Sequence, residues 1–261
     1  MYTMSLDNDL PKLTDMLLIL HNEGHLDELY KLHKNIINQS IQYHSGTQVA
    51  TFMDNDKKEI YKLCSKRIRY FGNFLTNNAT DFQKTINNLD HKFFVPIKQI
   101  IYENPHVFIY SQPFCSNSTS ILIEPYSALC QLLCLVYMIK QNKIVNDIGY
   151  HNIGLYQDHQ SRFDYHGMWH LNIDENGVIQ NDSAWSIQIL KNFDKFFNQK
   201  ALFEKQYFDK LTSILHQDRP KQTSIIKQLI KLYMTIYKAY KNKISYKDRH
   251  KLREKLKIVT N

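Results

Sequence analysis

The pattern of apolar and polar positions changes twice along the chain. Residues 11–23 and 26–37 place apolar side chains at the 3.6-residue period of amphipathic helices. From Ile41 the period becomes that of short strands, and beyond about residue 120 it is again helical. Both early helices precede the residues that could carry chemistry, so we expect them to be packing elements.

The middle of the chain predicts a β-rich segment. Three runs, IQY, QVATFM and IYKLC, are separated by polar turns and predict an antiparallel meander between Ile41 and Cys64. Thr80-Asp81-Phe82-Gln83 fits a capping box that opens a helix through Leu89. Strands are predicted again at Ile97–Tyr102 and Val107–Ser111, and the almost wholly apolar second one is expected inside the sheet.

The last part of the chain predicts helices after the polar connector SQPFCSNSTS. Ser127–Gln141 is apolar almost all round, which is typical of a buried helix. Further helices are predicted at Ala184–Asn198, Leu202–His216 and Thr223–Lys241. The predicted fold class is α+β, with a helical extension over residues 1–40, a small β-rich lobe over 41–112 and an α-rich lobe over 113–261.

Composition limits the class of protein. The chain has 261 residues, of which 43% are hydrophobic, so it can form a folded core. Its formal charge of +8 favours acidic partners or ligands. Neither a signal peptide nor an apolar run of about 20 residues is seen, so we expect a cytoplasmic protein, including the cytoplasm of a host cell. The four cysteines form no CxxC pair and are expected to be reduced core thiols.

The most specific local pattern is KIVNDIGYHNIGLYQ, in which Asp147 and Asn152 stand five residues apart between two apolar, strand-like pairs. This arrangement resembles the D-x-x-x-x-N catalytic loop of the protein kinase superfamily. The resemblance implies that Asp147 orients the attacking hydroxyl while the Asn152 amide oxygen coordinates Mg²⁺. The alternative is that both residues only form turns by bonding their own backbone.

A second metal ligand is expected downstream. In MWHLNIDENG an alternating run ends in Asp174, which resembles the strand that leads to the DFG motif, although Glu175 follows instead of Phe. DHQSRFDYHG would then be an elongated hairpin tip. Asp164, within FDYHG, is the rival ligand, and Asp174 is preferred because it follows a clean strand. Alternatively, Asp174 with Asn176 and Gly177 makes an ordinary β-turn.

Two upstream fragments extend the resemblance. EIYK resembles the third-strand VAIK motif, which implies that Lys62 bridges the α- and β-phosphates of ATP. SGTQVA resembles a reduced glycine-rich loop, so Gly46, Thr47 and Val49 would lie against the nucleotide. Lys62 could instead be a solvated lysine on an edge strand.

The small-lobe acid of the family has no clear counterpart, since no glutamate occurs between Lys62 and Glu103. Asp81 is the best-placed acid, unless it only favours the N-terminus of its helix. Downstream, NDSAWSIQIL and HQDRPKQTSIIKQLI resemble two later helix starts of the family. If Asp174 is the metal ligand, seven residues separate it from the first of these, which leaves no ordinary activation segment.

Two other clusters of the sequence could carry chemistry. His151, His159, His166 and His170 fall close together with Asp164, but Gly167 argues against the helix that would align them, so a metal site is not favoured. The C-terminal stretch KAYKNKISYKDRHKLREKLK, with Tyr237 directly before it, combines cations with Tyr237, Tyr240 and Tyr246. Such stretches can bind nucleic acid or anionic lipid, although a solvated helix face is the commoner explanation.

Together these fragments resemble a divergent, minimal member of the protein kinase-like superfamily, of the viral or pathogen-effector type. The resemblance implies a two-lobed fold holding ATP and Mg²⁺, and transfer of the γ-phosphate to a hydroxyl, expected to be on a protein. A pseudokinase scaffold without turnover is the first alternative. A basic helical nucleic-acid-binding protein is the second and is not favoured.

Overall fold

The computed structural model describes residues 41–45, 49–54, 58–65, 78–103, 107–115, 125–145, 153–162, 165, 168–180, 186, 189–191, 193–194 and 205–261. In these residues the protein is a mixed α+β chain, as expected. They form two compact units: one runs to Leu89 and includes Pro96–Phe114, and the other comprises Asp90–Val95 and the described residues from Cys115 onward. The helices predicted within residues 1–40 lie outside the described residues.

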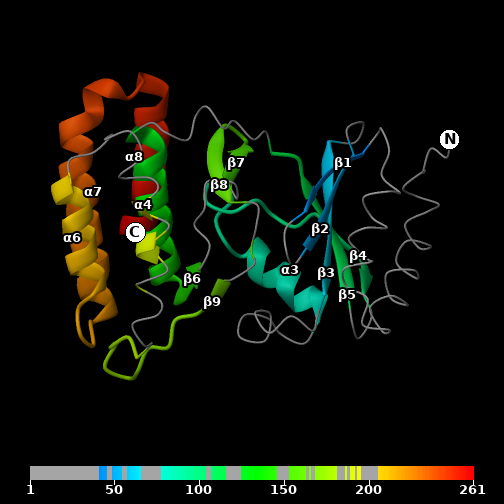
Figure 1. The fold of residues 1–261 in the computed structure, drawn as a ribbon, viewed down its shortest axis with the longest axis horizontal. Coiled ribbons are helices and arrows are strands. Elements are labelled where there is room, and N and C mark those ends of the chain that lie inside the picture. Colours follow the sequence, from blue (N-terminus) through cyan, green and yellow to red (C-terminus); the bar gives the residue numbers. More distant parts are fainter. Residues whose placement is uncertain are drawn as a thin grey trace. The chain divides into compact units, whose positions relative to one another are not determined.

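A five-stranded antiparallel sheet dominates the first unit (Figure 1). Its order is β1-β2-β3-β5-β4, with bounds Ile41–Ser45, Val49–Asp54, Glu59–Ser65, Val107–Pro113 and Gln99–Glu103 respectively. The first three strands form the predicted meander. The interior position predicted for β5 is also confirmed, since β3 and β4 pair with its two edges.

Helix α3, Ala79–Asn87, follows β3 in the chain, but the capping box predicted from Thr80 is wrong. Asn78 is the N-cap: its backbone is extended, and its side-chain oxygen accepts from the backbone N–H of Asp81 at 2.8 Å. Asparagine is among the strongest N-cap residues, so the cap lies two residues before the predicted one and Thr80 lies within the first turn of the helix.

Aromatic packing and one asparagine hold α3 on the sheet unit. The ring of Phe82 lies 5.4 Å from that of Phe108 and 5.5 Å from that of Tyr110, both on β5 and both buried. Asn87 exchanges two hydrogen bonds of 2.7 and 2.8 Å with the backbone of Ile97, just before β4. The helix is therefore fixed at its middle and at its C-terminal end.

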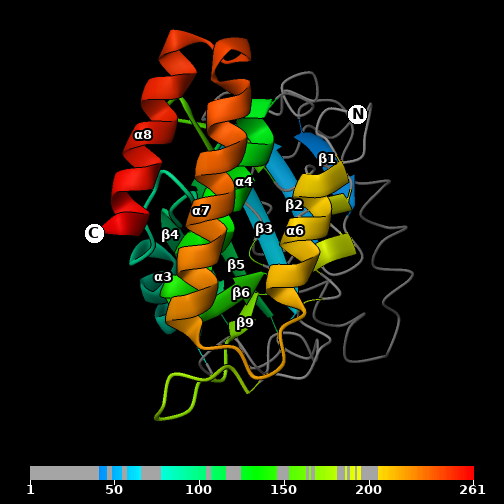
Figure 2. The same cartoon turned by 90° about the vertical axis from the view of Figure 1, so that its left-hand side faces the viewer.

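Helix α4, Pro125–Lys140, is the centre of the second unit and is buried almost all round, as predicted. Helices α7, Gln222–Tyr240, and α8, Tyr246–Thr260, pack against it, and α6, Lys205–Leu215, packs on α7 (Figure 2). The short 3-10 helix η4, Lys241–Lys243, joins α7 to α8. Of the predicted Ala184–Asn198 helix, the six described positions are helical. In the described part of the chain, no helix is long and apolar enough to span a membrane.

Two small antiparallel ladders complete this unit. β6, Lys143–Val145, pairs with β9, Met168–His170, and β7, Ile153–Tyr156, pairs with β8, His159–Arg162. Gln157 and Asp158 form the β7–β8 turn with φ of 47° and 67°, as a two-residue hairpin of the primed type requires. The elongated tip predicted over residues 158–167 is therefore wrong in its first half, because His159–Arg162 is a strand.

Candidate active site

Lys62 lies in the middle of β3, the central strand of the sheet, opposite Thr51 of β2 and Tyr110 of β5. It is 3% exposed. The alternative of a solvated lysine on an edge strand is therefore wrong. Because a lysine is rarely buried, its position on the central strand makes Lys62 the first candidate for a functional residue of the sheet unit.

Glu59 on the same strand is the acid nearest to Lys62 in sequence, but it faces the other way. Successive side chains of a strand alternate, so residues three apart point to opposite faces of the sheet. Glu59 is buried and forms an ion pair with Lys98, just before β4. It thus stabilises the sheet and does not replace the missing small-lobe glutamate.

Asp81 is better explained as an acid that stabilises the start of α3 than as the acid that pairs with Lys62. It lies in the first turn of α3, where its carboxylate accepts from the Asn78 amide at 2.9 Å and lies 3.8 Å from the Lys84 ammonium. Its side chain is 41% exposed. A carboxylate in this place is stabilised by the helix dipole, and this accounts for Asp81 without a ligand.

The predicted nucleotide loop falls between β1 and β2. β1 ends at Ser45 and β2 begins at Val49, so SGTQVA spans the connection of an antiparallel pair. Gly46 and Thr47 lie outside the described residues, and so does the side chain of Val49. Their contact with a nucleotide remains a prediction.

The predicted catalytic loop is bracketed as expected. α4 is followed by β6, and the chain re-enters a strand at β7, so the loop leaves one strand and enters another. Asp147 and Asn152 themselves lie outside the described residues. The turn between α4 and β6 is fixed at Asn142, whose carbonyl accepts from Leu171 N at 2.8 Å and whose side chain accepts from Gln222 at 2.6 Å.

Asp174 lies in a tight turn, and both of its carboxylate oxygens are used there. Oδ1 accepts from the backbone N–H groups of Asn176 and Val178, both at 2.9 Å, while Oδ2 accepts from Gln180 at 2.7 Å. Gly177 supplies the φ of +73° that the turn needs. β9 ends four residues earlier, at His170, so the clean strand expected to lead into Asp174 is shorter than predicted.

Asp164, the rival metal ligand, stands between two anchored points, although it lies outside the described residues itself. On one side, Arg162 ends β8 and exchanges backbone hydrogen bonds with Phe93 and Val95, at 2.7 and 2.8 Å. On the other side, Tyr165 is 2% exposed, and its hydroxyl donates to the carbonyl of Val95. A strand leads to Asp164 and a buried aromatic residue follows it.

A buried lysine that the sequence analysis missed holds the β7–β8 hairpin to α8. Lys255 is 1% exposed, and its ammonium donates to the carbonyls of Gln160 (3.0 Å) and Lys92. It also lies 4.2 Å from the ring centroid of Phe93. Leu252, Lys255 and Val259 recur at helical spacing on the buried face of α8, and this spacing was the available signal.

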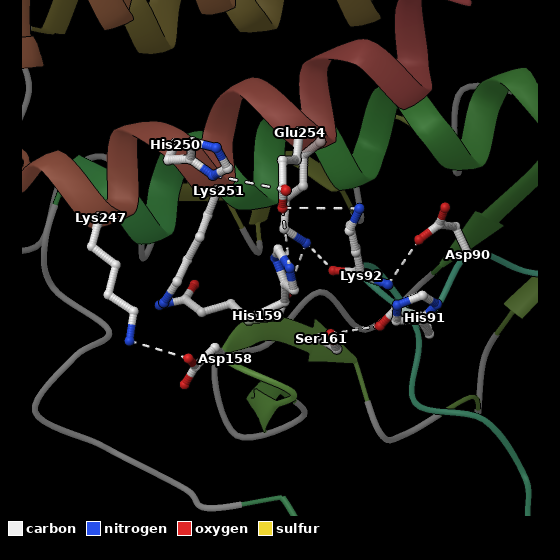
Figure 3. A network of polar contacts seen from close by, with 12 residues as sticks. Asp90, His91, Lys92, Asp158, His159, Ser161, Lys247, His250, Lys251 and Glu254 are labelled. Atoms are coloured by element: carbon white, nitrogen blue, oxygen red, sulfur yellow. Dashed lines mark hydrogen bonds and ion pairs between the residues drawn. The ribbon is translucent and has the colours of Figure 1, made fainter.

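Glu254, the residue before Lys255, lies close to one lysine and two histidine side chains (Figure 3). Its carboxylate lies 3.4 Å from His159 Nε2, 3.9 Å from the Lys92 ammonium and 3.8 Å from His250 Nδ1. Burial lowers the pKa of His159 to about 4, with Lys255, Lys92 and Lys251 adding to the effect and Glu254 opposing it. His159 is therefore neutral at pH 7.

This pKa predicts a loss of stability on acidification. The ordinary pKa of histidine, 6.5, applies to the unfolded chain, so His159 stabilises the fold fully above pH 6.5, and this contribution is lost as the pH falls towards 4. The contribution amounts to at most about 3 kcal/mol. We expect His159→Gln to flatten the pH dependence of the free energy of unfolding in urea over this range. His250→Gln, at a side chain that is 64% exposed, is the control and should leave the slope unchanged.

The described segments also contain histidine and cysteine side chains, which are the usual ligands of transition metals. No set of three His, Cys, Asp or Glu side chains within them could hold a metal ion. His159 is engaged with Glu254, and His170 is exposed at the end of β9. Cys115, Cys130 and Cys134 are buried free thiols, and burial raises the pKa of Cys130 to about 11.

Known proteins resemble this chain in structure more than in sequence. No protein family matches it, and neither does any curated protein. Among solved structures it is similar to vaccinia related kinase 3, with a TM-score of 0.47 and 9% sequence identity, over 76% of this chain and 86% of that one.

Proposed function

We propose that this protein is a kinase-like phosphotransferase that uses ATP and Mg²⁺ and transfers the γ-phosphate to a hydroxyl, on a protein acceptor. The observation that carries the proposal is Lys62, buried on the central strand of a five-stranded antiparallel sheet. The order of the elements supports it, since α3 comes between β3 and β4, and the strand–loop–strand around Asp147 follows the buried α4.

Each residue would have a separate role. Lys62 would neutralise charge on the α- and β-phosphates, beneath a loop of Gly46, Thr47 and Val49. Asp147 would orient the acceptor hydroxyl, and Asn152 with one aspartate would hold Mg²⁺. When bound, the metal would neutralise charge that develops on the phosphates. Catalysis would thus come mainly from positioning and electrostatics.

For the second metal ligand we favour Asp164 over Asp174. The criterion that first favoured Asp174 was a strand leading into it, and β8 leads to Asp164 with one residue between them. The aromatic Tyr165 follows Asp164, as an aromatic residue follows the aspartate of D-F-G. Asp174 already accepts three local hydrogen bonds, which explains its presence without a metal.

Two matched variants test this assignment. Asp164→Asn is expected to abolish Mg²⁺-dependent ATP binding and transfer, because an amide is a weaker ligand for Mg²⁺ than a carboxylate. Asp174→Asn is expected to keep both and to lower the free energy of unfolding by about 1 kcal/mol, through its weakened turn. Binding is measured by fluorescence of an ATP analogue with and without Mg²⁺.

If Asp174→Asn abolishes Mg²⁺-dependent ATP binding and Asp164→Asn keeps it, Asp174 is the metal ligand. If the wild-type protein binds no ATP at any Mg²⁺ concentration, the phosphotransferase proposal itself is wrong.

A nucleotide-binding scaffold without turnover is the second candidate. It is favoured by the position of Asp81, which is half-exposed at the cap of α3 and is accounted for by its local contacts. A thermal-shift assay with ATP, followed by a turnover assay, separates the candidates, since a scaffold would show the shift and no transfer.

A further inference from the structure

The positive charge of this chain is concentrated at its C-terminal end. Residues 221–261 hold twelve Lys and Arg against two Asp and Glu, a formal charge of +10. The whole chain carries +8, so the preceding 220 residues together carry −2. The charge that makes the protein basic therefore lies on α7, η4 and α8, and the proposed phosphotransferase site uses none of it.

Part of this charge lies around the connection between α7 and α8, seen where the two helices meet in Figure 2. We define the basic tip as Lys241, Lys243, Tyr246, Lys247 and Arg249. The three lysines are exposed and Arg249 is partly exposed. Because η4 spans only three residues, the helices bring these side chains to one end of the unit.

The two acids within residues 221–261 are engaged with groups outside the defined tip. Asp248 accepts from Ser245 at the N-cap of α8 and lies 3.6 Å from Lys251, while Glu254 is engaged with His159, Lys92 and His250. Lys247 does pair with Asp158 at 3.1 Å, but both side chains are about 70% exposed. An ion pair this exposed contributes little and can exchange for another anion.

Tyr246 distinguishes the tip from an ordinary basic surface. It is 75% exposed, and among the described residues no other large hydrophobic side chain is exposed. The Arg249 guanidinium lies 5.9 Å from its ring centroid. By contrast, Tyr240 is buried, with the Lys243 ammonium 5.2 Å from its ring. The tip thus offers one exposed aromatic ring with a cation, Arg249, beside it.

We propose that the basic tip binds single-stranded nucleic acid, with a base stacked on Tyr246 and the backbone phosphates on Lys241, Lys243 and Lys247. Such proteins combine a basic track with aromatic rings that stack on bases. A membrane surface is less favoured, because interfacial binding needs an apolar face and the described part of the tip exposes one ring only. The proposal is independent of the phosphotransferase activity.

Fluorescence anisotropy with a labelled oligothymidylate of about 20 nucleotides tests this on the full chain. The double variant Lys243→Gln with Lys247→Gln is expected to weaken binding and to reduce the slope of log K against log salt by about 1.4, or about 0.7 for each lost phosphate contact. Tyr246→Ala is expected to weaken binding about tenfold without changing the slope, whereas Tyr246→Phe should keep the affinity.

The matched control removes the same charge elsewhere on α7. Lys227 and Lys231 are also exposed, but they lie about 15–20 Å along the helix from the tip. Lys227→Gln with Lys231→Gln should leave affinity and slope nearly unchanged. Equal losses of oligonucleotide affinity in the two double variants would mean that only the net charge of the protein matters. That result would overturn the proposal.

Two further outcomes would also overturn it. One is an unchanged affinity in Tyr246→Ala, because the tip would then be an electrostatic surface without base stacking. The other is tighter binding to vesicles of phosphatidylcholine and phosphatidylserine than to the oligonucleotide, which would assign the tip to lipid. Asp147→Ala should bind the oligonucleotide like wild type whether or not the protein transfers phosphate.

Discussion

Asp147→Ala is expected to lower phosphate transfer by about 10²–10⁴-fold while leaving ATP binding nearly unchanged, because it removes the group that orients the acceptor and no phosphate contact. Lys62→Met should instead weaken ATP binding together with transfer. Transfer of labelled γ-phosphate to protein acceptors or water measures the first quantity, and fluorescence of an ATP analogue measures the second.

Lys58→Met is the matched control for Lys62→Met. It removes the same charge four residues earlier, at an exposed position in the turn before β3. Its binding and transfer should equal those of the wild-type protein. Identical losses of ATP binding in Asp147→Ala and Lys62→Met would contradict the separate roles proposed for these residues, and circular dichroism must show that each variant is folded.

Lys255→Ala is expected to lower the free energy of unfolding by about 3–5 kcal/mol. The substitution leaves the buried carbonyls of Lys92 and Gln160 without their donor and opens a cavity where the lysine stem packs on Phe93. Lys255→Met should recover part of the loss, since it refills the cavity without restoring the hydrogen bonds. Urea unfolding, monitored by far-ultraviolet circular dichroism, measures the free energy of unfolding of the wild-type protein and of both variants.

Lys257→Ala provides the comparison on the same helix. Its side chain is exposed, so the free energy of unfolding should change by less than about 0.5 kcal/mol. A loss of similar size at both positions would mean that helix propensity or net charge, and not the buried contacts of Lys255, stabilises α8.

The strands of the first unit could be predicted because their local patterns agree with their surroundings. β5 is nearly all apolar and is paired on both edges, and the meander is interrupted by polar turns. The cap of α3 was placed wrongly because two good cap residues stand two positions apart, and local sequence does not say which one starts the helix. The position of Lys62 on β3 was predicted, but its burial could not be, since burial depends on the pairing of β5 with β3.

β8 was missed for a different reason. Its sequence, HQSR, is polar throughout, yet all four residues are buried. Distant groups bond two of them: Gln160 donates to Ser127 at 2.7 Å, and Ser161 donates to the carbonyl of His91 at 2.9 Å. Because these partners lie 33 and 70 residues away, no local pattern could identify the strand. That omission in turn led to the preference for Asp174 over Asp164.

The segment Asp90–Val95 belongs to the helical unit, although the residues on both sides of it in the chain belong to the sheet unit. Neither unit is therefore one continuous stretch of polypeptide. A gene fragment starting at Cys115 would encode all of α4 and α8 but would lack the backbone that pairs with Arg162 and the Lys92 carbonyl that Lys255 needs. During synthesis the contact between Lys92 and Lys255 can form only after the last helix is made, and because neither unit is one continuous stretch, the two units cannot be exchanged between proteins by a single crossover.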